Sequence, residues 1–231
     1  MNETDCLYDK HVKCLVCSHG FTTKKLRSKY VRPIQHDTDF CSYYDSENRN
    51  PLYYYITVCP ECGYSFSDEF SSYFPPRTLD AIEEKVWSNW GKLNYCGERD
   101  LRQSLNTYKL AIYCAQLKQE KHVAAAGIFL RLAWLYRTEG KTAQEFRFMQ
   151  LAADEYTQSY STGDFKGSHL SEVRVLYLAG ELNRRLGRTN QATLYFSRII
   201  ERQKEFLEKS VIQMAKDQWQ EIRAEKQRAA N

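Results

Sequence analysis

The pattern of apolar and polar positions changes at two consecutive prolines, residues 75–76. Before them no helical period is sustained, and short alternating stretches predict strands and loops. The clearest alternation covers residues 52–58, so we expect a half-buried strand there that leads directly into Cys59. Shorter strands are expected at residues 21–23 and 30–34. The first part of the chain therefore reads as a small β domain.

After the prolines, apolar side chains recur every three or four residues, which predicts amphipathic helices that pack on one another. The predicted helices are Leu79–Trp90 ended by Gly91, Asp100–Gln119, Lys121–Arg137, Thr142–Tyr160, Leu170–Leu186 ended by Gly187, one that begins near Asn190, and a last segment over residues 207–222. The third of these is apolar on nearly all sides, and we expect it to be central.

Two stretches of the helical part share a set of small and aromatic residues. The positions are Leu132, Ala133, Tyr136, Gly140 and Ala152 in the first, and Ala179, Gly180, Gly187, Ala192 and Phe196 in the second. This spacing is typical of tetratricopeptide units, in which small residues let antiparallel helices approach closely. The glycines Gly140 and Gly187 are separated by more than the ~34 residues of a tandem array. The helices are therefore tetratricopeptide-like.

Composition places the chain among ordinary globular proteins, since 42% of its residues are hydrophobic and 27% are charged. The N-terminal ten residues lack the basic and apolar regions of a secretory signal. No apolar run reaches the ~18 residues of a membrane span. We therefore expect a cytoplasmic protein with no membrane contact. In a reducing compartment, paired cysteine motifs favour metal binding over disulfide formation.

Two C-x-x-C motifs carry the clearest chemistry in the sequence. The first is formed by Cys14 and Cys17, and the second by Cys59 and Cys62, which is followed by Gly63. Such turns direct two sulfurs at one metal ion, and two of them complete a tetrahedral zinc site. The sequence predicts one structural Zn²⁺ held by these four thiolates, which would staple the small β domain.

Other roles for the cysteines and their neighbours are weaker. Redox-active thiols of the C-x-x-C type stand at the start of a helix, and neither pair opens an evident helix. His19 could replace one sulfur, but a lone nearby histidine is more often outside the ligand set. Cys96 and Cys114 fall within helical patterns and are expected in the core.

A run of cations over residues 24–32 is the best candidate for contact with nucleic acid. It comprises Lys24, Lys25, Arg27, Lys29 and Arg32, with aromatic residues beside them. However, the first 76 residues are slightly acidic, so the net charge of +4 comes from the helical part. A solvated strand edge is the plainer interpretation of this run. Likewise, Arg184, Arg185 and Arg188 suit the C-terminus of a helix.

The acidic loop Asp37–Cys41 is a second possible site. Asp37, Asp39 and Cys41 could form a catalytic pocket with nearby tyrosines, although turn capping by the aspartates and packing of the cysteine is the simpler interpretation. No nucleophile elbow, phosphate-binding loop or zinc-protease helix is present in the sequence. We therefore assign no catalytic residues and expect a protein that is not an enzyme.

Several short motifs recur together along the chain. They are Cys14-x-x-Cys17, Asp37-x-Asp39-Phe40-Cys41, Asn50-Pro51-x-x-Tyr54, the turn from Val58 to Tyr64, Tyr108-Lys109-Leu110-Ala111, and Leu132 to Arg137. Jointly they resemble the bacterial family catalogued as domain of unknown function 2225, over about Lys10 to Phe206. The resemblance implies a bacterial cytosolic protein with a zinc-ribbon-like head and a tetratricopeptide-like body, and it carries over no activity. Leu15 and Ser18 depart from the proline and glycine usual in such a turn.

These observations predict an α+β protein that is mainly α. A zinc-ribbon-like β domain over residues 1–76 precedes a tetratricopeptide-like, right-handed helical array over residues 77–231. The expected function is a zinc-binding scaffold or adaptor for a protein partner. Two alternatives stay open: a nucleic-acid-binding zinc ribbon, and an enzyme with a site near Asp37, Asp39 and Cys41.

Overall fold

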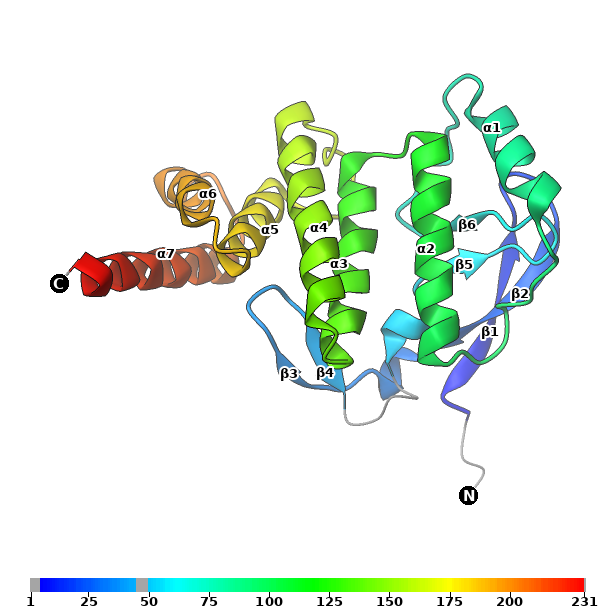
Figure 1. Cartoon of the computed structure of the whole chain (residues 1–231), viewed down its shortest axis with the longest axis horizontal. Coiled ribbons are helices and arrows are strands. Elements are labelled where there is room, and N and C mark those ends of the chain that lie inside the picture. Colours follow the sequence, from blue (N-terminus) through cyan, green and yellow to red (C-terminus); the bar gives the residue numbers. More distant parts are fainter. Residues whose placement is uncertain (1–4, 45–49, 231) are drawn as a thin grey trace. The chain divides into compact units, whose positions relative to one another are not determined.

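The computed structural model describes residues 5–44 and 50–230 (Figure 1). The chain forms two compact units. The head unit comprises Met1–Asp37 and Cys41–Glu120, and the helical unit comprises Thr38–Phe40 and Lys121–Asn231. Residues 1–4, which belong to the N-terminal segment without the pattern of a secretory signal, and residues 45–49 lie outside the described residues.

The two units divide after Glu120, whereas the sequence pattern suggested a domain boundary after residue 76. The reason is that the first two helices complete the core of the head unit. Ile82, Val86 and Cys114 from these helices join the buried cluster that contains Cys14 and Cys59. The prolines therefore mark where helices begin along the chain, and the first hydrophobic core extends 44 residues further.

The head unit consists of three short antiparallel hairpins and two helices. Its elements are β1 (Leu7–Lys13), β2 (Gly20–Leu26), β3 (Pro33–His36), β4 (Ser42–Tyr44), β5 (Thr57–Val58), β6 (Ser65–Phe66), α1 (Thr78–Lys85) and α2 (Leu101–Lys118). Strand β1 pairs with β2, β3 with β4, and β5 with β6. Helix α2 packs against the β5–β6 hairpin (Figure 1).

The strand predicted over residues 52–58 is wrong for most of its length. Residues Pro51–Tyr54 form a 3₁₀ turn that Asn50 caps, since its Oδ1 accepts a hydrogen bond from the Leu52 amide at 3.0 Å. Strand β5 is confined to Thr57–Val58. The shorter prediction at residues 21–23 lies within β2, and that at residues 30–34 overlaps a 3₁₀ turn at Ser28–Tyr30 and the start of β3.

Side chains from distant positions explain why this tyrosine-rich segment is not extended. The Tyr108 hydroxyl donates to the Leu52 carbonyl at 3.0 Å, and Arg99 donates to the Ile56 carbonyl at 2.7 Å. The Lys25 ammonium donates to the Tyr54 carbonyl at 2.7 Å. These donors satisfy backbone acceptors that a sheet would otherwise pair. Tertiary contacts thus override the alternating pattern.

Within the described residues the chain has seven α-helices, five of them in the helical unit. These are α3 (His122–Thr138), α4 (Thr142–Thr162), α5 (Glu172–Arg185), α6 (Thr189–Glu201) and α7 (Lys209–Ala230). Helix α3 packs with α4, α5 with α6, and α7 lies against α6 and α5 (Figure 1). None of the described helices is long and apolar enough to cross a membrane. The fold is thus α+β and mainly α, as predicted.

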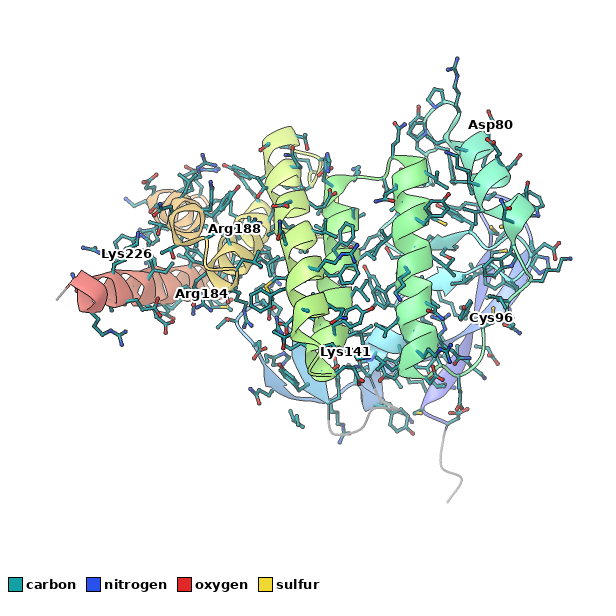
Figure 2. The ribbon with its side chains drawn as sticks, viewed as in Figure 1. Asp80, Cys96, Lys141, Arg184, Arg188 and Lys226 are labelled. Carbon is teal, nitrogen blue, oxygen red and sulfur yellow. The ribbon has the colours of Figure 1, made fainter. Side chains whose placement is uncertain are left out.

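The turns within the two helix pairs are copies of each other. Gly140 and Gly187 both adopt left-handed φ angles, +66° and +74°. The amide of Lys141 reaches back to the Tyr136 carbonyl at 2.9 Å, and that of Arg188 reaches the Asn183 carbonyl at 2.8 Å. This is the glycine-dependent Schellman ending of a helix. Figure 2 labels the two equivalent residues, Lys141 and Arg188.

The second pair is packed so closely that it depends on a glycine. A methyl group on Gly180 of α5 would lie 2.7 Å from the Phe196 ring of α6. Both Gly180 and Phe196 are fully buried, and Ala192 lies one turn before the ring. These are the positions that the repeat pattern singled out, so the pattern reports a real contact between helices.

We expect Gly180→Ala to destabilise the protein by about 1–3 kcal/mol through overpacking, although alanine is the better helix former by about 1 kcal/mol. Thermal or urea unfolding measures the change. Adding Phe196→Leu, which removes the opposing ring edge, should restore part of the loss. A more stable Gly180→Ala variant would contradict the close packing of α5 on α6.

Candidate metal centre

Four cysteine side chains converge in the head unit. The sulfurs of Cys14, Cys17, Cys59 and Cys62 all lie within 4.8 Å of one another. Between the two motifs, the Sγ atoms of Cys14 and Cys62 are 3.6 Å apart, as are those of Cys17 and Cys59. Cys14, Cys59 and Cys62 are buried, and Cys17 is partly exposed. The structure therefore brings together the cysteines that the sequence paired.

The two C-x-x-C turns have the same backbone hydrogen bonds. In the first, the Cys14 amide donates to the His19 carbonyl at 2.9 Å and the Ser18 amide to the Cys14 carbonyl at 3.1 Å. In the second, the Cys59 amide donates to the Tyr64 carbonyl at 3.0 Å and the Gly63 amide to the Cys59 carbonyl at 2.9 Å. Each turn begins where a strand ends, after β1 and after β5.

Ser18 and Gly63 occupy equivalent, left-handed positions, with φ angles of +59° and +75°. The serine that departs from the usual glycine therefore keeps the conformation of the turn, at the cost of the strain that a side chain meets there. The difference lies in the surroundings. A methyl group on Gly63 would lie 2.5 Å from the Trp90 ring, whose Nε1 donates to the Pro60 carbonyl at 2.9 Å.

The four sulfurs fit a tetrahedral metal ion. Thiolate bonds of about 2.3 Å, as on Zn²⁺, require sulfur separations of about 3.8 Å, close to the 3.6 Å observed in two of the pairs. The contacts with Cys14 and Cys62 lower the pKa of the Cys59 thiol, whereas contact with Cys59 raises the pKa of Cys14 to about 12. A divalent cation at this centre would hold all four sulfurs as thiolates.

The other candidate ligands lie elsewhere. The His19 ring stacks on Phe21 with centroids 6.2 Å apart, and His19 joins the turn through its backbone carbonyl. Cys114 is buried, as predicted, and accepts a hydrogen bond from the Ser65 amide at 3.3 Å. Cys96 precedes α2, where its sulfur lies 3.8 Å from the Val58 carbonyl (Figure 2).

The basic run does not form a single exposed stripe. Lys24 and Lys25 are neighbours in β2 and therefore point to opposite faces of the hairpin. Lys24 pairs with Asp9 at 3.1 Å. Lys25 is turned inward to the Tyr54 carbonyl, and burial lowers its pKa to about 8. Arg27 donates to the Asp5 carbonyl at 3.1 Å.

Asp39 belongs to the helical unit, where it is fully buried. Both of its carboxylate oxygens accept hydrogen bonds from Arg137, at 3.0 and 2.7 Å, and Trp134 Nε1 donates to one of them at 3.1 Å. Burial opposes ionisation, but the bonds and charge of Arg137 outweigh it and hold the pKa of Asp39 below its ordinary value. The carboxylate is thus engaged as an anion.

The flanking residues of this loop belong to the head unit. The Asp37 carboxylate accepts a hydrogen bond from the Tyr43 hydroxyl at 2.9 Å, and the Asp37 amide donates to the Cys41 carbonyl at 2.8 Å. Cys41 is fully buried. These contacts agree with the simpler interpretation, in which aspartates order a turn and the cysteine packs.

Sequence reasoning missed the partners of Asp39 and the indole that covers the second cysteine turn. Trp134 and Arg137 lie in one motif, Leu132–Arg137, and their spacing of three places them on one face of α3. An arginine beside a tryptophan on the buried face of an apolar helix is a signal that an acidic partner exists. Nothing in the pattern identifies Asp39 as that partner, because 95 residues separate it from Trp134.

The comparison with protein families gives one match. A family model described as an uncharacterized protein conserved in bacteria, DUF2225, matches residues 7–222. No curated protein and no solved structure matches the chain.

The equivalent positions of the two cysteine turns make a matched pair of substitutions. Gly63→Ala should destabilise the protein by at least about 2 kcal/mol, because a side chain at this left-handed φ is strained and would also clash with the Trp90 ring. Ser18→Gly should be neutral or stabilising by up to about 1 kcal/mol, because it relieves the same strain. Chemical unfolding of both variants measures the difference. Equal losses at the two positions would contradict the equivalence of the turns.

Proposed function

The chain belongs to the bacterial family DUF2225, and from that premise we propose that it is a non-enzymatic, zinc-binding scaffold or adaptor for a protein partner. One Zn²⁺ staples the head unit, and the helical unit supplies the partner surface. The single observation that carries the zinc assignment is the convergence of four thiols from two matching turns. The repeated helix pairs support the role of the helical unit as a partner surface.

Zinc is the ion that best suits this donor set. Four soft thiolates at tetrahedral spacing favour zinc or iron, and C-x-x-C turns joined to short strands are typical of structural zinc. The four ligands, Cys14, Cys17, Cys59 and Cys62, would leave no open position for a substrate or water. The role is therefore to hold together hairpins as short as β5 and β6, each two residues long.

The helical unit supports the scaffold role through its repeated geometry. The matching turns at Gly140 and Gly187 and the close contact of Gly180 with Phe196 fit a tetratricopeptide-like array, which we propose to coil right-handed. Two of its helices expose large apolar side chains, with Phe146 of α4 45% exposed and Leu194 of α6 44% exposed. Exposed side chains of this size supply apolar contact area for a protein partner.

Two observations favour this function over the alternatives. Nucleic-acid binding would use the basic run, yet Lys24 is paired with Asp9 and Lys25 is turned inward, which reduces the positive surface that phosphates require. An enzyme near Asp39 would need that carboxylate to exchange protons, yet Arg137 and Trp134 bind it as an anion. Both alternatives stay less supported predictions.

Purified protein should contain about one zinc per chain by elemental analysis. Cys59→Ser and Cys62→Ser should each lower the metal content and unfold the head unit, since structural zinc contributes folding free energy directly. Cys96→Ser is the control, because its sulfur lies outside the cluster, and it should keep the full zinc content. A stable protein that contains no zinc after growth in zinc-replete medium would overturn the assignment.

The scaffold role predicts a defined protein complex. Affinity capture of the full chain from a bacterial lysate should return a partner in near-stoichiometric amount, and Phe146→Ser with Leu194→Ser should weaken its recovery. The Cys96→Ser variant serves again as the control with unchanged recovery. A well-folded chain that captures nothing at any salt concentration would rule out the scaffold role.

A further inference from the structure

The helical unit contains a three-residue segment from a distant part of the sequence. Thr38–Phe40 groups with α3 to α7, although it precedes them by some eighty residues. Each of the three side chains has its own partners there, so the unit recognises a sequence and not merely a stretch of backbone.

Asp39 is held by a fork from α3. Arg137 binds both carboxylate oxygens through its two terminal nitrogens, which is the bidentate geometry that guanidinium offers to carboxylate. Trp134 adds a third donor, and Arg185 of α5 lies 3.7 Å away. A neutral side chain of the same size would lose this recognition.

The two neighbours of Asp39 are recognised by α5. The Tyr177 hydroxyl donates to the Thr38 carbonyl at 2.8 Å, and Arg185 donates to the Thr38 hydroxyl at 2.9 Å. The Phe40 ring lies against Tyr177 with centroids 5.4 Å apart, and the Arg174 guanidinium lies over its face at 5.5 Å. An aromatic residue is thus selected directly after the carboxylate.

The receptor groups are positioned by the helices themselves. Glu145 of α4 binds Arg137 Nε at 2.7 Å, which orients the fork toward the carboxylate. The buried Glu181 binds Arg184 and Arg185, each at 2.8 Å. Figure 2 shows Arg184 near the end of α5. Because these contacts do not involve Asp39, the receptor is preorganised without it.

The Asp39 carboxylate lies among guanidinium groups. Arg137 pairs with it at 2.7 Å and Arg185 lies 3.7 Å away, while Glu145 and Glu181 neutralise part of this positive charge. The site therefore favours an acidic ligand.

The segment that fills the receptor is strained. Phe40 adopts a left-handed φ of +67°, a conformation that residues with side chains rarely take. The Phe40 side chain is also half-buried, whereas Asp39 is fully buried. A ligand that offers the same carboxylate and ring without this strain would gain binding free energy over the resident segment.

We propose that the face of α3 and α5 lined by Trp134, Arg137, Tyr177 and Arg185 is a receptor for a turn in which an aspartate precedes an aromatic residue. Thr38–Phe40 fills it as an intramolecular ligand. A protein partner that presents the same turn binds there by displacing the resident segment. This inference rests on the proposed scaffold function and specifies the chemistry of its partner.

The test uses the full chain with the receptor emptied by Asp39→Ala and Phe40→Ala. The probe is a fluorescent cyclic peptide with the sequence of residues 36–42, His-Asp-Thr-Asp-Phe-Cys-Ser, carrying Cys41→Ser. Fluorescence anisotropy should show binding at least ~10-fold tighter to the emptied variant than to the unmodified chain, where the tethered segment competes. Replacing the second aspartate of the peptide by asparagine should weaken binding by ~10-fold or more.

Two matched arginine variants test whether the peptide binds at Arg137. In the emptied chain, Arg137→Lys should abolish the preference for aspartate, because lysine cannot form the bidentate fork. Arg147→Lys, on the exposed side of α4, should leave the peptide affinity unchanged. Equal affinity for the aspartate and asparagine peptides, or equal effects of the two arginine variants, would overturn the proposal.

A second variant covers the case in which the emptied chain does not fold. Phe40→Ala alone removes the ring while it keeps the left-handed strain and the buried carboxylate, and it should bind the peptide more tightly than the unmodified chain does. Absence of peptide binding to a folded Phe40→Ala or emptied chain would overturn the receptor. If the peptide does not bind but a protein partner is captured, the receptor is overturned and the scaffold function is kept. If the peptide binds but no partner is captured, the scaffold function is overturned instead.

Discussion

The head unit depends on the convergence of four sulfurs from segments about 45 residues apart in the sequence. Strands as short as β5 and β6 bury too little apolar surface to stabilise themselves. Two matching turns solve this by presenting their thiols to one centre, which is covered by Ile82 of α1, Val86 at the end of that helix and Cys114 of α2. The metal-binding turn and the helices that follow it are therefore one core, which is why the unit extends to Glu120.

Short sequence motifs of this chain contact one another in pairs. The acidic loop at Asp39 meets the tryptophan and arginine of the Leu132–Arg137 motif through three hydrogen bonds. The Asn50–Tyr54 motif meets the Tyr108 motif through the bond of its hydroxyl to the Leu52 carbonyl. In both cases a side-chain donor from a helix binds a group on a loop. In the second case the Tyr108 hydroxyl takes the place of a sheet hydrogen bond, as Arg99 does at the Ile56 carbonyl.

Residues with local signals were predictable from the sequence, and those defined by distant partners were not. The four cysteines, the start of α2 at Asp100 and the turns at Gly140 and Gly187 follow from spacing and capping, and the structure confirms them. The strand predicted at residues 52–58 failed because Arg99, Lys25 and Tyr108 bind its carbonyls. Asp39 appeared to be a turn residue, since one sequence does not reveal that Arg137 is its partner. Periodicity describes faces, whereas buried ion pairs join positions that share no period.

The buried ions of the helical unit are best understood as determinants of specificity. Removing Asp39 and Arg137 from water carries a desolvation penalty that their attraction need not exceed, so a pair of apolar side chains could hold the same helices as well. What apolar groups cannot do is select one segment over another. Arg137 is oriented by Glu145, Arg185 is oriented by Glu181, and both therefore accept a carboxylate at one position and in one direction. Two arginines directed at one carboxylate from α3 and α5 have a physical use where the surface must distinguish one turn from another, which is the requirement of a recognition surface.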